Sequence, residues 1–275
     1  MRDMASRALV FPGQGSHADG MEEPHRVNSM LARGLEVLGH DPFPRLDAGT
    51  RTQQPALFLC SVAAWDAAGR PRAAAAAGHS LGEYAALVAA GALEFDDAVA
   101  LVDERAAAMA AAAAQMRGGM VAMLGGERAD VEGLAAQLGL TVANDNAPGQ
   151  LVLSGRLDAL AVVEEYAREV GARVRRLDVG GAFHSPLMGP AAERLAAALE
   201  RVEFRAPDMP VYSGGSAAPF AHPRRELAEN LLRPVRWRET VLAMRAAGIE
   251  RFVELGPGRV LTGMVRRIVP EAVAV

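Results

Sequence analysis

The sequence predicts an α/β protein whose large part is built on a parallel sheet and carries a smaller, inserted part. Three observations lead to this fold class. Short apolar stretches at residues 8–11 and 251–255 fit buried strands, and each runs into a glycine-containing loop. Residues 78–82 place a serine between two glycines where a strand turns into a helix. Between residues 118 and 182 the pattern changes to strand, helix, strand, strand, helix and strand.

The composition fits either one large domain or one domain with an insertion, and it excludes several classes of function. The chain has 275 residues, 51% of them hydrophobic, which is enough for a sizeable core. A net charge of −4 argues against general binding of nucleic acid. The single cysteine, Cys60, excludes an internal disulfide and a cysteine-rich metal site. Residues 1–7 lack the apolar core of a signal peptide and no apolar run reaches membrane-spanning length, so we expect a cytoplasmic protein without a membrane partner.

The first strand, residues 8–11, leads into the glycine-rich loop at residues 12–17. This loop lacks the lysine of a P-loop and the third glycine of a dinucleotide site. It is therefore either a plain turn or a loop that brings a backbone N–H close to a reacting atom. A helix is expected near residues 27–38. A second helix is expected to open at residues 52–55, with Pro55 in its first turn, and to run to residue 68.

Ser80 lies between Gly78 and Gly82 in the pattern of a nucleophile elbow. In such a turn the serine takes a strained backbone conformation that exposes its hydroxyl, and side chains two residues away would collide. The helix that follows directs its N-terminus at the reacting oxygen, which favours negative charge there. The alternative is an ordinary Gly-Ser turn between a strand and a helix.

The next helix begins near residue 94 with acidic residues in its first turn and contains Arg105. The neighbours of Arg105 three and four residues away are all apolar: Leu101, Val102, Ala108 and Met109. A guanidinium on an apolar face needs an anion, because it cannot lose its proton. Either the side chain reaches water at the helix edge, or it binds a carboxylate of the substrate.

The inserted part has strands near residues 120–124, 140–143, 150–155 and 173–179, with helices near 130–138 and 157–170 and a turn at residues 144–149. This order is typical of the ferredoxin-like unit. We therefore expect a large α/β-hydrolase-like subdomain with a parallel sheet over residues 1–117 and 183–275, and a ferredoxin-like (βαββαβ) small subdomain over residues 118–182.

His184 lies in the loop at residues 180–188, directly after the last strand of the inserted part. A histidine there is well placed to meet a serine that is distant in the sequence. The alternative is a histidine that is satisfied by local backbone groups. The remaining elements are strands at 209–213 and 251–255 and helices at 190–202, 226–232, 240–247 and 260–268.

Several separate motifs occur in one order over nearly the whole chain. They are residues 11–16 (Phe-Pro-Gly-Gln-Gly-Ser), 54–57 (Gln-Pro-Ala-Leu), 78–83 (Gly-His-Ser-Leu-Gly-Glu), Arg105, 146–150 (Asn-Ala-Pro-Gly-Gln), 182–185 (Ala-Phe-His-Ser), 234–237 (Pro-Val-Arg-Trp) and 254–258 (Glu-Leu-Gly-Pro-Gly). With these motifs the chain resembles the malonyl-CoA:acyl-carrier-protein transacylase family and the related acyltransferase domains of polyketide synthases.

The resemblance implies a role for seven residues. Ser80 is the nucleophile and His184 its base. The backbone N–H groups of Gln14 and Leu81 form the oxyanion hole. Three further roles concern the substrate and the base: Arg105 holds the malonate carboxylate, Phe183 limits the space beside the malonyl α-carbon, and a backbone carbonyl at Arg236 orients His184.

Two residues depart from the family pattern. His17 stands where the family often has glutamine, and Arg236 stands where bacterial fatty-acid enzymes often have glutamine. Arginine at the latter position resembles the polyketide branch, so the sequence leaves open whether the pathway makes fatty acids or polyketides.

The resemblance implies transfer of malonyl from a CoA thioester to the phosphopantetheine thiol of an acyl carrier protein, through a seryl ester and with ping-pong kinetics. It implies no cofactor and no metal, and we expect a monomer. One alternative is a serine hydrolase such as a thioesterase, which would need an acid between serine and histidine in the chain. The others are a non-enzymatic binding subunit, a transacylase subunit of malonate decarboxylase and a free-standing polyketide acyltransferase.

Overall fold

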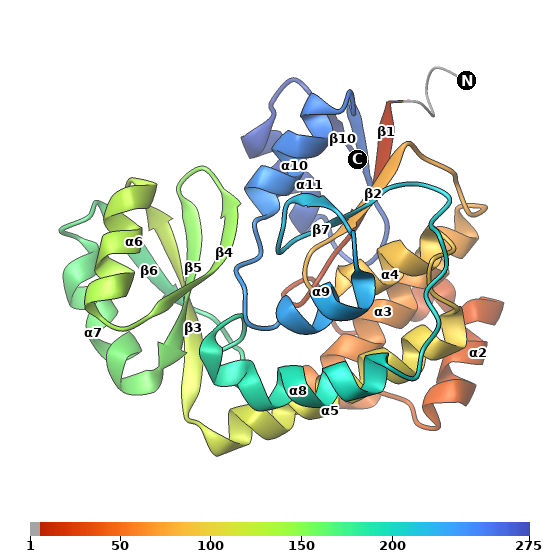
Figure 1. Cartoon of the computed structure of the whole chain (residues 1–275), viewed down its shortest axis with the longest axis horizontal. Helices are drawn as coiled ribbons and strands as arrows, with labels where there is room; N and C mark the ends of the chain where they lie inside the picture. The colour runs from red at the N-terminus through yellow and green to blue at the C-terminus, as the bar shows by residue number, and fades with distance from the viewer. Residues whose placement is uncertain (1–5) are drawn as a thin grey trace.

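A six-stranded sheet in the order β10-β9-β1-β2-β7-β8 lies at the centre of the large part of the protein (Figure 1). The structure is a computed structural model, and it describes residues 6–275. All neighbouring strands of this sheet are parallel except β7 and β8. The strands are β1 (Arg7–Phe11), β2 (Ala75–Gly78), β7 (Val211–Ser213), β8 (Ala218–Pro219), β9 (Arg251–Glu254) and β10 (Val273–Ala274). The parallel sheet predicted from the sequence is thus confirmed.

Both faces of this sheet are covered by helices. Leu9, Phe11 and Ala76 pack into one core with α3, α4 and α5, whereas Ala8 and Val10 pack into a second core with α10 and α11. The helices of the large part are α2 (Ser29–Leu38), α3 (Thr50–Ala67), α4 (Gly82–Ala89), α5 (Phe95–Gln115), α8 (Gly189–Leu199), α9 (Pro223–Glu229), α10 (Trp237–Ala246) and α11 (Val260–Ile268). Short 3-10 helices are η1 (Glu23–His25), η2 (Phe43–Ala48) and η3 (Pro186–Met188). Successive side chains of β1 point to opposite faces of the sheet, so one continuous run of apolar residues contributes to both cores.

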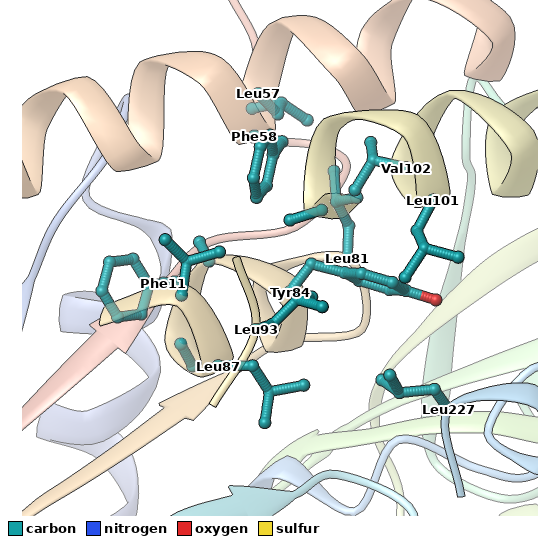
Figure 2. Packing of buried hydrophobic residues seen from close by; sticks show 14 of the residues in the cluster. Phe11, Leu57, Phe58, Leu81, Tyr84, Leu87, Leu93, Leu101, Val102 and Leu227 are labelled. Atoms are coloured by element: carbon teal, nitrogen blue, oxygen red, sulfur yellow. The ribbon is translucent and has the colours of Figure 1, made fainter. Parts of the chain in front are cut away.

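Helix α4 is buried almost throughout, so the elbow that precedes it is fixed from all sides. Leu81, Tyr84 and Leu87 are each 1% exposed. Figure 2 shows them among Phe11 of β1 and Leu57 and Phe58 of α3. Close packing of this kind resists small displacements.

Helix α3 begins earlier than the sequence predicts. It starts at Thr50, so Pro55 lies in the second turn and not in the first, which corrects the expectation. The preceding residue, Gly49, has a φ of 76°, and the Gln53 amide donates to the carbonyl of Leu46 at 3.0 Å. Side-chain bonds of this polar stretch to η2 therefore extend the helix backwards beyond its apolar part.

The small part is a four-stranded antiparallel sheet in the order β4-β5-β3-β6, with two helices. Its elements are β3 (Gly118–Gly125), α6 (Arg128–Gln137), β4 (Thr141–Ala147), β5 (Gln150–Arg156), α7 (Leu157–Ala167) and β6 (Ala172–Arg176). The predicted order of strands and helices is confirmed. The expected turn at residues 144–149 is wrong in extent, since β4 continues to Ala147 through two register shifts against β5.

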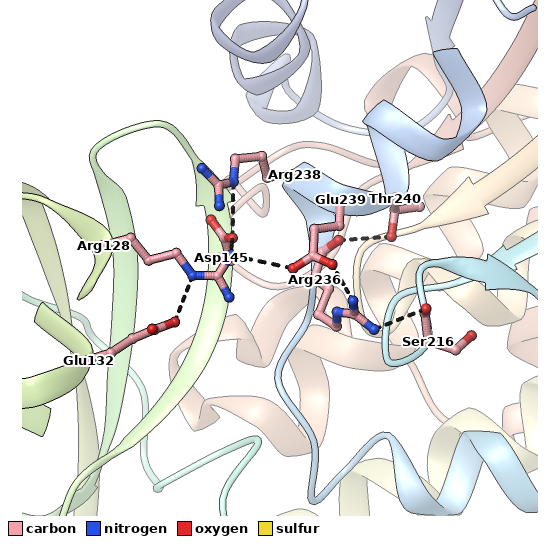
Figure 3. Close-up of polar contacts among 8 residues, drawn as sticks. All are labelled: Arg128, Glu132, Asp145, Ser216, Arg236, Arg238, Glu239 and Thr240. Atoms are coloured by element: carbon pink, nitrogen blue, oxygen red, sulfur yellow. Dashed lines mark hydrogen bonds and ion pairs between the residues drawn. The ribbon is translucent and has the colours of Figure 1, made fainter. Parts of the chain in front are cut away.

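Strand β4 joins the small part to the large one. The N–H of Asp145 donates to the carbonyl of Val235 at 2.9 Å, and the N–H of Val235 donates to Ala143 at 2.8 Å. The Asp145 carboxylate, 4% exposed, accepts bonds from Arg128 at 2.8 Å and Arg238 at 3.1 Å. Figure 3 shows this carboxylate between α6 of the small part and α10 of the large part. The junction is thus fixed by backbone hydrogen bonds together with ion pairs from two partly exposed arginines to one buried carboxylate.

The long helix α5 leads into the small part, and α8 returns beside it (Figure 1). None of the helices within residues 6–275 combines the length and the apolar character needed to cross a membrane. Residues 1–5, which belong to the amino-terminal stretch considered for a signal peptide, lie outside the described residues.

Candidate active site

The turn between β2 and α4 is as crowded as the sequence predicts. A Cβ atom at Gly78 would lie 1.9 Å from the backbone carbon of Gly82, and one at Gly82 would lie 2.1 Å from the Phe11 carbonyl oxygen. Ser80 itself has a φ of 53°, a left-handed conformation that is strained for a residue with a side chain. The two glycines are therefore required by contact, and Ser80 is held in an unusual conformation by its surroundings.

Ser80 and His184 meet across the site, although they are far apart in the sequence. The Oγ of Ser80 lies 2.8 Å from Nε2 of His184. The other ring nitrogen, Nδ1, donates to the backbone carbonyls of Asn230 at 2.8 Å and Arg233 at 3.1 Å. Because two carbonyl oxygens face Nδ1, that nitrogen carries the proton, and Nε2 is free to accept one from Ser80.

The expectation that the carbonyl of Arg236 orients His184 is wrong. That carbonyl accepts bonds from the N–H of Thr240 at 2.8 Å and from its hydroxyl at 2.9 Å. Arg236 immediately precedes α10, so the first turn of the helix takes up its carbonyl. Its guanidinium binds Glu239 and the Ser216 carbonyl (Figure 3). The orienting carbonyls come instead from Asn230, directly after α9, and from Arg233 in the loop that follows.

Burial keeps His184 neutral. The side chain is 5% exposed. Desolvation, and after it the charge of Arg105, lowers the pKa of His184 from 6.5 to about 3. A neutral imidazole at physiological pH can act as a base toward the serine hydroxyl.

The guanidinium of Arg105 is buried beside Ser80 without a carboxylate partner. Arg105 is 3% exposed, and its Nη2 donates to the Ser80 Oγ at 2.8 Å, while Nη1 donates to Oε1 of Gln54. Its Cζ lies 5.9 Å from the centre of the Tyr84 ring. Within residues 6–275 it forms no ion pair with an acidic side chain, and burial lowers its pKa. The alternative in which this arginine reaches water is therefore wrong.

Thr50, Gln53 and Gln54 lie in the first turns of α3 and bind the side chains of Arg105 and Gln14. The sequence alone assigns no role to these three residues. Gln54 binds Arg105 through its carbonyl oxygen and donates to Oγ1 of Thr50 at 2.6 Å. Gln14 accepts a bond from Thr50 at 3.2 Å and donates to Gln53 at 3.1 Å. The run of polar residues before an apolar helix was the available indication, since such residues are buried here only because they bind one another.

The glycine-rich loop after β1 lies directly against the elbow. A Cβ at Gly13 would be 2.3 Å from the carbonyl oxygen of His79. In the part of the chain that the structure describes, the N–H groups of Gln14 and Leu81 donate no hydrogen bond. Two free backbone donors close to a serine hydroxyl are suited to an oxyanion.

His79, the residue before the serine, links the elbow to the small part. Its Nε2 lies 2.8 Å from Oδ1 of Asn146 on β4, and its ring lies 5.8 Å from that of Trp237. Burial lowers the pKa of His79, so this ring too is neutral. Both residues belong to motifs of the sequence, but only the fold brings them together.

A cavity of about 450 Å³ opens at the junction of the two parts. Its lining includes Ser80, Phe183 and His184 from the large part and Ala122, Asn146 and Arg176 from the small part. A volume in this range suits a small-molecule substrate. No group of three or more potential metal-ligating side chains is found among residues 6–275.

A strained serine bonded to a neutral histidine on an α/β sheet is the arrangement of serine enzymes that form acyl intermediates. Comparison with known sequences gives the particular family. The acyl transferase domain family matches residues 34–274, and the chain belongs to this family.

Similar proteins cover almost all of the chain. The malonyl CoA-acyl carrier protein transacylase of Salmonella typhimurium is 37% identical over 97% of this chain and 94% of its own length. The polyketide biosynthesis protein ThaF of Burkholderia thailandensis is 36% identical over 98% of this chain, which spans 24% of that longer protein. A malonyl-transacylase solved in complex with a type II PKS acyl-carrier protein is 35% identical, with a TM-score of 0.92 over 98% of this chain and 94% of its own.

The lowered pKa of His184 predicts an unusual pH profile for the reactivity of Ser80. In the variant Glu83→Gln, which removes the neighbouring buried carboxyl group whose pKa is raised to about 7, the rate at which an activated ester acylates Ser80 should stay nearly constant from about pH 8 to about pH 6, because the imidazole remains neutral over this range. The rate should fall only well below the ordinary histidine pKa, as protonation removes the base. Stopped-flow acylation measures the profile, with circular dichroism as the control for folding. A half-maximal rate near pH 6.5 would contradict the assignment.

Proposed function

We propose that this protein transfers a malonyl group from malonyl-CoA to the phosphopantetheine thiol of an acyl carrier protein through a seryl-malonyl ester. The observation that carries the proposal is the buried guanidinium of Arg105, 2.8 Å from Ser80 Oγ and without a carboxylate partner in the described chain. A malonyl group brings a free carboxylate to this position when its thioester carbonyl lies at Ser80. The transacylases among the similar proteins support the same reaction.

In the first half-reaction Ser80 Oγ bonds to the thioester carbonyl carbon while its proton passes to Nε2 of His184. The tetrahedral oxyanion accepts bonds from the N–H groups of Gln14 and Leu81, each worth about 3 kcal/mol in comparable sites. The C–S bond then breaks, and the CoA sulfur leaves with the proton from His184. The carbonyls of Asn230 and Arg233 keep the imidazolium oriented in between.

In the second half-reaction the carrier thiol gives its proton to His184 and attacks the seryl ester. Collapse of the intermediate returns the proton to Ser80 Oγ and releases the malonyl carrier thioester. The two halves share one site, so the kinetics are ping-pong. Proton transfer and oxyanion binding are both supplied by the chain, so we propose that no cofactor takes part.

The domain division proposed for this function places residues 1–117 and 183–275 in an α/β-hydrolase-like subdomain and residues 118–182 in a ferredoxin-like one. The strand order β4-β5-β3-β6 and the junction at β4 support this division. We propose that the protein is a monomer and that it is located in the cytoplasm. An ordinary hydrolase triad is disfavoured, since backbone carbonyls and not an acid face Nδ1 of His184. The carrier belongs to fatty-acid or polyketide synthesis, and the similar proteins include a polyketide biosynthesis protein and a transacylase bound to a type II PKS carrier.

The acyl-enzyme is the most direct test of this function. Brief incubation with malonyl-CoA should add one malonyl group to the peptide that contains Ser80, because no thiol acceptor is present to remove it. Mass spectrometry of the native protein and of Ser80→Ala measures the adduct. Subsequent addition of a carrier protein should move the label to its thiol. Release of free malonate with no labelled carrier would indicate a hydrolase instead.

Phe183 is expected to separate malonyl from methylmalonyl donors. Its ring is 4% exposed and lines the cavity beside His184. One methyl group changes binding in a pocket by only about 1–3 kcal/mol, so the native preference for malonyl should be strong but incomplete. Phe183→Ser should reduce this preference about tenfold or more by opening space at the α-carbon. Competition between the two CoA esters measures it, and equal use of both by the native enzyme would contradict the role.

A further inference from the structure

One buried carboxylate beside the site takes no part in the mechanism given above. Glu83 lies three residues after Ser80 in the first turn of α4 and is 3% exposed. We propose that Glu83 is a positioning residue for His184 that acts through Asn230. The inference deepens the proposed function, since it concerns the base of the same serine.

The carboxylate of Glu83 accepts hydrogen bonds from two amide groups and, within residues 6–275, forms no direct ion pair. Its Oε1 accepts a bond from the N–H of Gly214 at 2.7 Å. The side-chain amide nitrogen of Asn230 lies 3.0 Å from Oε1 and 3.1 Å from Oε2. Burial raises the pKa of Glu83 to about 7, against the opposing effects of these donors and of the charge of Arg105. Carboxyl groups are seldom buried, and those that are buried are held by hydrogen bonds or opposite charges.

Asn230 connects this carboxyl group to the base. Its backbone carbonyl accepts the Nδ1–H of His184 at 2.8 Å, while its side chain binds Glu83 and the Ser213 hydroxyl, the latter at 3.0 Å. The side chain of Asn230 is closely packed against Gly215, since a Cβ atom at Gly215 would lie 2.0 Å from Oδ1 of Asn230. One residue thus faces Glu83 with its side chain and His184 with its backbone.

The hydrogen bonds among these residues form a closed ring that begins and ends at the turn before α4. Ser80 and Glu83 belong to the same turn, His184 binds Ser80, and Asn230 binds both His184 and Glu83. His184 has a φ of 54°, so its backbone is strained and must be held by its surroundings. Asn230 follows the last residue of the short helix α9, where backbone positions are readily displaced. Glu83 therefore fixes the distance between the carbonyl that orients the base and the helix that carries the nucleophile.

The role differs from that of the acid in a Ser-His-Asp triad, because Glu83 does not touch the imidazole. During the reaction no proton passes from His184 to Glu83, and Glu83 acts on the position of the Asn230 carbonyl. Loss of the carboxylate would let the Asn230 carbonyl shift, and displacements of about 1 Å at a reacting pair can cost about 100-fold in rate.

The test compares Glu83→Gln, Glu83→Ala and Asn230→Ala. Glutamine keeps one acceptor oxygen, so Glu83→Gln should lower kcat about 10-fold and Glu83→Ala about 100-fold, with KM for malonyl-CoA within about twofold of the native value. Since Glu83 acts through the Asn230 side chain, adding Glu83→Gln to Asn230→Ala should cause almost no further loss. The rate at which a fluorophosphonate labels Ser80 should fall in parallel, and this readout does not depend on malonyl as the substrate.

Glu226→Gln is the matched control. Its carboxylate is also buried, and it accepts two backbone N–H bonds, from Ala221 at 2.9 Å and His222 at 2.7 Å, at the other end of α9. This variant should keep kcat within about twofold even if its thermal stability falls.

Unchanged kcat and labelling in both Glu83 variants would overturn the inference, and so would losses that multiply in the double variant. Should Glu83→Ala fail to fold, the isosteric Glu83→Gln and its double variant still decide. Failure of the native protein to use malonyl-CoA, with fluorophosphonate labelling that depends on Glu83, would instead refute the proposed function alone.

Discussion

The site depends on a guanidinium that is buried without a direct ion pair in the described chain, although the charge of Glu83 acts on it from farther away. Removing a charge from water is costly unless it is paired, and the two described side-chain acceptors of Arg105, Gln54 and Ser80, are both neutral. The free protein tolerates this arrangement because those bonds and the face of Tyr84 partly replace water. A carboxylate on the substrate completes the pairing, so binding and selectivity have the same physical source. The same positive charge also keeps His184 neutral, because it adds to the effect of burial on that pKa. Arg105 therefore acts both in recognition of the substrate and on the protonation state of His184.

The catalytic geometry arises where elements far apart in the chain are forced into contact. Ser80 and His184 both have left-handed backbones, and each is held by packing and hydrogen bonds from other segments. The elbow is fixed by close approach of the β1 loop, while the carbonyls that orient the histidine come from the segment that follows α9. Asn146 of strand β4 forms a hydrogen bond with the ring of His79, and this bond connects the small part to the residue next to the nucleophile. The backbone strain thus lies at the two reacting residues, and packing and hydrogen bonds from the rest of the fold stabilise it.

Sequence reasoning predicted the parts of the site that local chemistry determines. The need for Gly78 follows from crowding within one turn, and the lack of an acid one helical turn from Arg105 follows from helical spacing, so both could be inferred. The need for Gly82 depends instead on the close approach of Phe11 from β1. The parallel sheet and the order of elements in the insertion follow from apolar patterns. The carbonyls that face His184 could not be inferred, because they depend on where α9 ends and where α10 takes up the carbonyl of Arg236. The early start of α3 and the length of β4 likewise depend on tertiary hydrogen bonds that outweigh local propensity.

The central claim is that the unpaired charge of Arg105 selects an acyl group that carries its own carboxylate. The most direct measurement is the rate at which Ser80 is acylated by malonyl-CoA and by acetyl-CoA, in the native protein and in Arg105→Ala. Leaving a buried charge unpaired costs about 3–5 kcal/mol, so the native protein should prefer malonyl by about 100-fold or more. Arg105→Ala should lose most of its malonyl rate and bring the two donors within about tenfold of each other. Rapid acylation of the native protein by acetyl-CoA, or a preference for malonyl that survives in Arg105→Ala, would contradict the account.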